Sequence, residues 1–430
     1  MLVNNRASPF HRSGQVVLLG ALLFLVAGTH LLFAAPGLPR IPEWTHAYAA
    51  EHGPELTARA AVLLDAQTGT VLYEREGDTV IPPASLTKLV AMYAAFEMIA
   101  EGRIALDDVV ALPPETWARN TPVGSSLMFL GPDQRVTVRE LLLGLAVSSG
   151  NDAAVALALH ASGSVPAFVD EMNRVVADLD LPSLHFEEPS GLSAENQVTA
   201  REFAWFVRAY LERHPHAASE YHSIPEFTFP HSASYPDGRI NVGAITQFNR
   251  NSLLRTYTGA DGLKTGFIRQ SSYNLAATAA RDGRRLIVVI LGAPGENHLQ
   301  GERNRSADAT GLFDFGFDRF QAVRLHVPVA DPVRVWGGRV RTVVPGAVVP
   351  EYITVARSHV QELAGVIVQD FEIEAPVKAG QVVGRVQISA GESVLMELPL
   401  TIAEAVDRAG WIRVAWDRMV RFVVQLIGRR

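Results

Sequence analysis

Two hairpin patterns, far apart in the sequence, constrain the fold of this chain more than any other feature. The first covers residues 60–75, where two apolar runs flank the turn sequence of residues 65–69. The second covers residues 273–291, where two apolar runs flank Asp282-Gly283, a dipeptide typical of tight hairpin turns. Several helix-like segments lie between them. Strands joined by hairpins, with a block of helices inserted, predict an α+β fold in which helices pack on an antiparallel sheet.

The residue pattern of the sequence changes after Phe320. Short β-rich runs punctuated by proline and glycine follow, which predicts a small all-β domain. The length of 430 residues and a hydrophobic fraction of 48% allow several domains with a real core. We therefore predict four parts: an export signal or N-terminal membrane anchor in residues 1–50, the main α+β domain in 51–320, the β-rich domain in 321–402 and a terminal helix in 403–430.

The N-terminus carries an export pattern. Arg6 and Arg12 precede an apolar run over residues 15–35, which is long for a cleavable signal and just long enough to span a membrane. Residues 47–49, Ala-Tyr-Ala, form a plausible cleavage site but lie well beyond the run. A cleaved signal and an uncleaved anchor therefore both stay open, and a buried core helix is the third possibility. Because the cations come first, the rest of the chain is expected on the extracytoplasmic face of the membrane.

Charge and composition exclude several classes of partner and site. A net charge of −7 supplies no basic field for nucleic acid. The absence of cysteine excludes disulfides and thiolate metal sites. The 13 histidines are scattered, and the nearest approach to a cluster is His214-Pro215-His216, whose spacing and proline prevent two ligands from sharing one helix face. We predict a solvated loop there and no metal site.

Ser85 and Lys88 form the first candidate for chemistry. Their spacing of three residues places both side chains on one face of a helix. The segment up to Phe96 is apolar on every side, and Lys88 is its only charge, which indicates a helix buried all round. Burial disfavours the ammonium form of lysine, and a neutral amine can accept the proton of the serine hydroxyl. The alternative is a serine N-cap beside a solvent-reaching lysine, which a fully buried helix disfavours.

A joint between two predicted helices is the second candidate. Thr137 and Glu140 form a capping-box pattern ahead of one helix, and a second helix is expected from about Ala153. Between them, Ser149 offers a hydroxyl that can relay a proton, and Asn151 offers an amide donor and an acceptor. Taken alone, this joint is explained more simply as the end of one helix and the N-cap of the next.

The tripeptide Lys264-Thr265-Gly266 is the third candidate. It precedes the second hairpin and is predicted to lie on an edge strand, where an extended substrate can add itself to the sheet. Glycine permits a close backbone approach, while the lysine charge and the threonine hydroxyl suit a substrate carboxylate. Taken alone, the tripeptide is explained more simply as the start of an ordinary strand.

Together, the three elements are far more specific. S-x-x-K, S-x-N and K-T-G, in this order, form the active-site set of penicillin-recognising serine acyl transferases. The chain resembles the low-molecular-mass penicillin-binding proteins, which are serine-type D-alanyl-D-alanine carboxypeptidases. The likeness extends from about residue 60 to residue 317 and includes residues 188–200, EPSGLSAENQVTA, and 261–267, DGLKTGF. The β-rich domain and the terminal helix also look like that family's architecture. The resemblance implies the penicillin-binding, serine β-lactamase-like fold.

The resemblance also implies roles for the residues that match the motifs. Ser85 would be the acylated nucleophile and Lys88 its base, Ser149 would relay a proton to the leaving amine, and Asn151 would hold the substrate amide. The backbone N–H groups of Ser85 and Phe267 would form the oxyanion hole.

On the carboxylate side, the resemblance implies that Lys264 steadies the site electrostatically and that Thr265 binds the terminal carboxylate. The family uses a further arginine upstream of an aromatic-Gly-Phe stretch, here residues 315–317. Arg305 is the best match, and Arg303 lies close enough to remain an alternative.

The implied reaction is removal of the terminal D-alanine from peptidoglycan stem peptides through a serine acyl-enzyme, without any cofactor, and β-lactam antibiotics would acylate the same serine. A D,D-endopeptidase would use the same residues on a different leaving amine and stays open. A serine β-lactamase is disfavoured because we find no convincing Glu-x-x-x-Asn motif for deacylation. A catalytically inactive envelope scaffold is disfavoured by the intact motifs.

The terminal residues 403–430 are predicted to form an amphipathic helix. At 100° steps, its polar residues fall in one arc and its apolar residues opposite. Six arginines against three acidic residues, with two tryptophans, suit a helix lying in an anionic membrane surface. The alternative is a terminal helix that docks on its own protein. The polar arc contains Arg413, Asp417, Arg418, Arg421 and Gln425.

Overall fold

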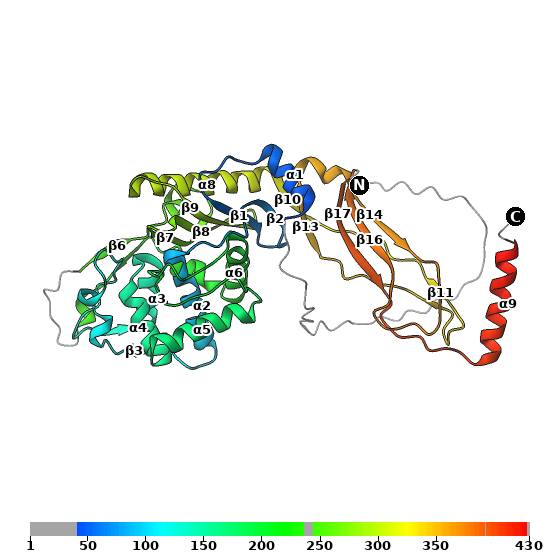
Figure 1. Ribbon diagram of the computed structural model, residues 1–430, viewed down its shortest axis with the longest axis horizontal. Helices are drawn as coiled ribbons and strands as arrows, with labels where there is room; N and C mark the ends of the chain where they lie inside the picture. The colour runs from blue at the N-terminus through cyan, green and yellow to red at the C-terminus, as the bar shows by residue number, and fades with distance from the viewer. Residues whose placement is uncertain (1–40, 236–243, 392, 428–430) are drawn as a thin grey trace. The chain divides into compact units, whose positions relative to one another are not determined.

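The computed structural model describes residues 41–235, 244–391 and 393–427, without the side chains of 424–427. The apolar run of the predicted export segment, residues 15–35, lies outside this part, whereas the end of that segment, residues 41–50, lies inside it and includes the candidate cleavage site at 47–49. A five-stranded sheet with the order β2-β1-β9-β8-β7 organises the larger domain (Figure 1). All neighbouring strands pair antiparallel, and the two predicted hairpins supply four of the five. The strands are β1 (Ala60–Asp65), β2 (Val71–Arg75), β7 (Ala260–Ile268), β8 (Ser272–Arg281) and β9 (Arg284–Ala293).

Helices cover both faces of this sheet (Figure 1). α8 (His298–Arg319) runs along one face, and α6 (Ala200–Arg213) packs on the other against β1 and β9. Strands β1 and β9 are therefore buried almost throughout, which explains their continuous apolar sequence. Leu312 and Phe313 of α8 join the sheet in one apolar cluster, where each such side chain contributes roughly 1.5–3 kcal/mol by burial.

The helical block between the hairpins surrounds α2 (Thr87–Ala100). Nearly every residue of α2 is buried, Lys88 included, which confirms the predicted helix buried all round. Within the described residues, no single helix is long and apolar enough to cross a membrane, although α4 and α5 pass that test together as a pair bent by 87°. The remaining elements of the block are α3 (Val138–Leu143), α4 (Asn151–Ser162), α5 (Val165–Asp178), α7 (Leu253–Thr256), β3 (Val109–Val110), β4 (Val136–Thr137), β5 (Glu226–Thr228) and β6 (Thr246–Phe248); α1 (Glu43–His52) precedes the first hairpin.

His214 departs from the solvated loop predicted for residues 214–216. It is only 5% exposed, and its ring lies 5.2 Å from the ring of Phe96. Burial lowers the pKa of His214 to about 4. His216 is exposed, as expected. The prediction was wrong for His214 because its packing against α2 is a tertiary contact, which local spacing does not reveal.

The β-rich domain consists of small sheets, as its proline and glycine punctuation predicted. β10 pairs with β13, β12-β11-β15 form a second sheet and β14-β16-β17 a third. Two apolar clusters fill it, one around Val355 and Ile388 and another around Val335 and Ile402. Its strands are β10 (Phe320–Arg324), β11 (Val333–Trp336), β12 (Thr342–Val343), β13 (Tyr352–Ala356), β14 (Leu363–Gln369), β15 (Glu372–Glu374), β16 (Val382–Ala390) and β17 (Ser393–Thr401).

The terminal helix, α9 (Trp411–Ile427), begins later than residue 403. The segment before it belongs to the β-rich domain, because Val406 packs in an apolar cluster of that domain. The polar side of α9 faces the same domain: Asp417 accepts the N–H of Gly337 at 2.9 Å, and Arg421 lies 3.1 Å from Glu372.

The apolar side of α9 is exposed. Trp411, Trp416 and Phe422 are 80%, 62% and 64% exposed. The docking considered from the sequence is therefore present on the polar face, while the membrane-surface role of the exposed apolar face stays a prediction.

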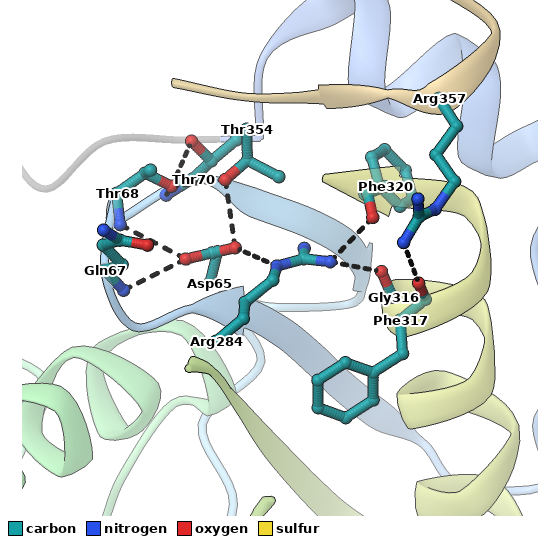
Figure 2. A network of polar contacts seen from close by, with 10 residues as sticks. All are labelled: Asp65, Gln67, Thr68, Thr70, Arg284, Gly316, Phe317, Phe320, Thr354 and Arg357. Carbon is teal, nitrogen blue, oxygen red and sulfur yellow. Dashed lines mark hydrogen bonds and ion pairs between the residues drawn. The ribbon is translucent and has the colours of Figure 1, made fainter. Parts of the chain in front are cut away.

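A buried polar network joins the two domains (Figure 2). Asp65, at the end of β1, is fully buried and pairs with Arg284 of β9 at 2.7 Å. Arg284 in turn donates to the carbonyls of Gly316 and Phe320 at the end of α8. Thr354 of β13 donates to the Asp65 carboxylate at 3.0 Å. The β-rich domain is thus hydrogen-bonded to the sheet that carries the site described next.

Candidate active site

The three sequence motifs meet at one cavity of about 510 Å³. The cavity lies where α2, the α3–α4 joint, the edge strand β7 and α8 converge. The predicted residues in its lining are Ser85, Ser149, Thr265, Phe267 and Arg305.

Ser85 lies in a short 3₁₀ turn, Ala84–Leu86, that leads into α2. Lys88, one turn further, donates from Nζ to Ser85 Oγ at 3.1 Å and to Asn151 Oδ1 at 2.7 Å, and it also donates to the Ser190 carbonyl. Lys88 is 0% exposed. Burial lowers its pKa to about 7, against the opposing charges of Glu188 and Asp152. A substantial fraction of neutral amine therefore exists at neutral pH, in contact with the hydroxyl.

The α3–α4 joint has an unusual backbone. A π-turn, Gly144–Ser148, follows α3, and Ser149 has left-handed dihedrals of φ 60° and ψ 34°. This region is uncommon for a residue with a side chain and is found disproportionately at functional sites. α4 then begins at Asn151, two residues earlier than expected. The capping box of Thr137 and Glu140 is present as predicted.

Asp152 was not predicted to contribute. It is buried, and its carboxylate accepts the N–H groups of Met128 and Leu130 at 2.8 and 2.9 Å. These bonds hold the loop that passes beside the joint, where Ser126 accepts the Asn151 N–H at 2.8 Å. The sequence feature that could have indicated this role is an acidic residue in the first turn of an apolar helix.

The Lys-Thr-Gly tripeptide lies on β7, which is an edge strand as predicted. Lys264 is 2% exposed, and its Nζ donates to the Thr265 carbonyl at 2.9 Å. Burial, together with the charges of Lys88 and Arg250, holds the pKa of Lys264 well below its usual range. A Cβ on Gly266 would lie 2.8 Å from the Pro83 carbonyl, so glycine allows β7 to approach the turn that carries Ser85.

Arg305 and Arg303, the two candidates for the carboxylate contact, lie in different surroundings. Arg305 is 7% exposed, lines the cavity and donates to the Gly266 carbonyl at 3.4 Å. Its Nε atom is buried without a hydrogen-bond partner. Burial lowers the pKa of Arg305 to about 10, so the guanidinium stays charged at neutral pH. Arg303 is exposed and does not line the cavity.

Phe267 follows Gly266 on β7, and its ring forms part of the cavity wall. It packs on Tyr273 and His298 with ring centroids 4.5 and 4.8 Å away. Tyr273 and His298 are in turn 3.2 Å apart between Oη and Nδ1. The wall beside Arg305 is therefore aromatic, which sequence reasoning did not anticipate.

The cavity is strongly cationic. Three arginines, Arg250, Arg255 and Arg305, line it together with one acidic residue, Glu302. Arg250 was not predicted, because it lies in a segment between β6 and α7 that shows no local pattern. Such a lining suits a substrate that carries a carboxylate. Within the described residues, no group of three or more histidine or acidic side chains could hold a metal ion.

A serine bonded to a buried lysine, beside an edge strand and a cationic cavity, defines a serine peptidase of the acyl-transferring class. Residues 47–295 match the family model for peptidase S11, D-alanyl-D-alanine carboxypeptidase, and residues 327–408 match the C-terminal domain of penicillin-binding protein 5. The chain belongs to the S11 family of serine-type D-alanyl-D-alanine carboxypeptidases.

Individual relatives agree with this assignment. The chain is 35% identical to the D-alanyl-D-alanine carboxypeptidase DacC of Escherichia coli over 86% of this chain and 90% of that protein. It is 34% identical to DacD of Salmonella typhimurium over 92% and 97%. Among solved structures, penicillin-binding protein 5 of Haemophilus influenzae superposes with a TM-score of 0.71 at 31% identity, over 83% of this chain and 99% of that chain. The family acts on cell-wall peptidoglycan, which implies an extracytoplasmic location.

Proposed function

We propose that Ser85 is the nucleophile of this carboxypeptidase and that neutral Lys88 is its base. The observation that carries the proposal is the 3.1 Å contact between Lys88 Nζ and Ser85 Oγ, made by a fully buried lysine whose pKa is about 7. The amine takes the hydroxyl proton as the serine oxygen attacks the carbonyl of the penultimate D-alanine. The terminal D-alanine leaves, and water then hydrolyses the acyl-enzyme.

Four groups assist the reaction in this proposal. The backbone N–H groups of Ser85 and Phe267 stabilise the oxyanion, a contribution worth about 2.7–4 kcal/mol per donor in comparable sites. Ser149, whose left-handed backbone presents it to the cavity, relays a proton to the leaving amine. Asn151 is tied to Lys88 and offers its amide to the substrate backbone.

Substrate selection follows from the cationic wall. Thr265 and Arg305 bind the terminal carboxylate, and Lys264 adds positive charge beneath it. The unpartnered Nε of Arg305 supports this role, because a buried guanidinium nitrogen without an acceptor gains most from an incoming carboxylate.

The membrane-surface role of α9 is also a proposal. The helix docks by Asp417 and Arg421 and presents an exposed face that includes Trp411, Trp416 and Phe422. An apolar face of this kind suits the boundary between headgroups and acyl chains. It would hold the enzyme at the extracytoplasmic membrane surface.

The direct test is incubation with a synthetic stem pentapeptide, followed by assay of released D-alanine. The wild-type chain should release D-alanine and bind a fluorescent penicillin covalently, while Ser85→Ala should do neither and keep its thermal unfolding profile. Labelling that persists in Ser85→Ala would remove this serine from its role. Cleavage of a cross-linked dimer in preference to the pentapeptide would favour the endopeptidase.

A further inference from the structure

Glu188 occupies a position next to the catalytic pair that the mechanism above does not use. Its carboxylate accepts hydrogen bonds from residues in the turn that follows it: the Ser190 N–H at 2.8 Å, the Ser190 hydroxyl at 2.5 Å, the Gly191 N–H, and the Ser193 N–H at 3.3 Å. The carboxylate therefore determines how this turn folds.

The same turn touches both members of the pair. The carbonyl of Ser190 accepts a hydrogen bond from Lys88. Gly191 packs so closely that a Cβ there would lie 1.9 Å from the Ala84 carbonyl oxygen and 2.8 Å from the Ser85 nitrogen. Gly191 also has φ +83°, which a side chain would strain. A small shift of the turn would therefore displace either the lysine or the serine backbone.

Asn196 links Glu188 to α2. Its Nδ2 donates to the Glu188 carboxylate at 3.1 Å and to the Thr87 hydroxyl at 3.1 Å. Thr87 directly precedes Lys88 in the sequence. Asn196 is 0% exposed, so this connection is shielded from water. The turn is therefore tied to α2 at Thr87, through Asn196, and at Lys88 itself, through the Ser190 carbonyl.

We propose that Glu188 is a positioning residue for Lys88. Its carboxylate folds the 188–191 turn around the Lys88 amine and places a negative charge facing that amine. This inference rests on the proposed roles of Ser85 and Lys88. Glu188 is not itself a base for deacylation, because its oxygens are occupied by these donors.

Four charged groups face Lys88 from the elements packed around it. Glu188 and Asp152 raise the pKa of Lys88, and Arg250 lowers it. Lys264, on β7, is also coupled to Lys88 by charge repulsion. Asp152 comes from α4, whereas Arg250 precedes α7. Removing the Glu188 charge therefore lets burial and the remaining cations lower the pKa of Lys88 further.

The test compares Glu188→Gln and Glu188→Asp with the control Glu187→Gln. Glu187 is the adjacent residue, 56% exposed and paired with His185. The rate of acylation by a fluorescent penicillin is measured across pH, and folding is monitored by thermal unfolding. The wild-type profile and Ser85→Ala test the proposed function separately from these variants.

Glu188→Gln should reduce the plateau rate about tenfold to a hundredfold, as expected for a displaced catalytic group, and shift the acid limb to lower pH. Glu188→Asp keeps the charge but is too short for all its donors, so it should lower the plateau without that shift. Glu187→Gln should match the wild type. An unshifted limb in Glu188→Gln would overturn the charge role. A wild-type plateau in Glu188→Asp would overturn the positioning role, even if Glu188→Gln fails to fold.

Discussion

At the residue scale, the site depends on basic side chains that the fold buries. Lys88, Lys264 and Arg305 are all nearly or fully buried. The pKa of each is lowered, and burial is the largest cause in every case. Desolvation favours the neutral form of a base, so Lys88, which contacts Ser85, is available for proton transfer. Arginine keeps its proton even when it is desolvated, so Arg305 suits a fixed contact with a carboxylate.

A substitution at Arg305 tests the carboxylate contact. Arg305→Gln should reduce kcat/KM for a peptide with a free terminal carboxylate by about tenfold to a hundredfold, because a hydrogen bond to a charged group contributes about 1.5–3 kcal/mol. A C-terminally amidated peptide should lose much less. Arg303→Gln is the matched control, since Arg303 is exposed and two residues away. A larger loss in the Arg303 variant would show that Arg303, and not Arg305, makes the carboxylate contact.

Much of the site at this scale could be predicted from the sequence. The apolar surroundings of Lys88 correctly indicated a buried amine, and the tripeptide of Lys264 was correctly placed on an edge strand. Arg250 could not be predicted, because only tertiary folding brings its segment to the cavity. The left-handed backbone of Ser149 could not be predicted either, because serine rarely adopts that conformation and its local propensity does not indicate it.

At the scale of single elements, α9 combines two contacts that an amphipathic pattern alone cannot distinguish. The pattern correctly separated polar from apolar residues, but it could not show that the polar face is docked through Asp417 and Arg421. It also placed the start of the helix too early, because Val406 contributes to a strand-like segment of the β-rich core.

Truncation after Gly410 tests the membrane role of α9. Removing residues 411–430 should release the protein from anionic lipid vesicles while carboxypeptidase activity is retained, because the truncation spares the Val406 cluster. Vesicle co-sedimentation measures the binding. Replacing both Trp411 and Trp416 with serine should weaken binding without removing the arginines. If the truncated chain stayed bound, the N-terminal segment would be the anchor instead.

At the scale of the whole molecule, the polar network around Asp65 connects the β-rich domain to the catalytic sheet (Figure 2). The hairpin patterns predicted β1 and β9, the strands that carry Asp65 and Arg284, but not the network. Asp65 and Thr354 are 289 residues apart in sequence, and no local pattern links residues at such a distance.

Replacing Thr354 with valine tests whether this junction stabilises the fold. The substitution keeps the shape but removes one donor from the fully buried Asp65 carboxylate. The free energy of unfolding should fall by about 1–3 kcal/mol, as measured by denaturant titration. Thr246→Val is the control, because Thr246 is exposed and bonds Thr228 on the surface. Equal effects of the two substitutions would argue against a stabilising junction.

The proposed chemistry requires Lys88 to be a neutral base at the pH where the enzyme works. The most direct measurement is the pH dependence of acylation of the wild-type chain by a fluorescent penicillin. Because the pKa of Lys88 is lowered to about 7, the rate should rise through a single acid limb with a midpoint near pH 7 and then level off. A rate that stays level far below that pH, or that rises only as pH approaches the ordinary range of lysine, would contradict the role of Lys88 as a neutral base.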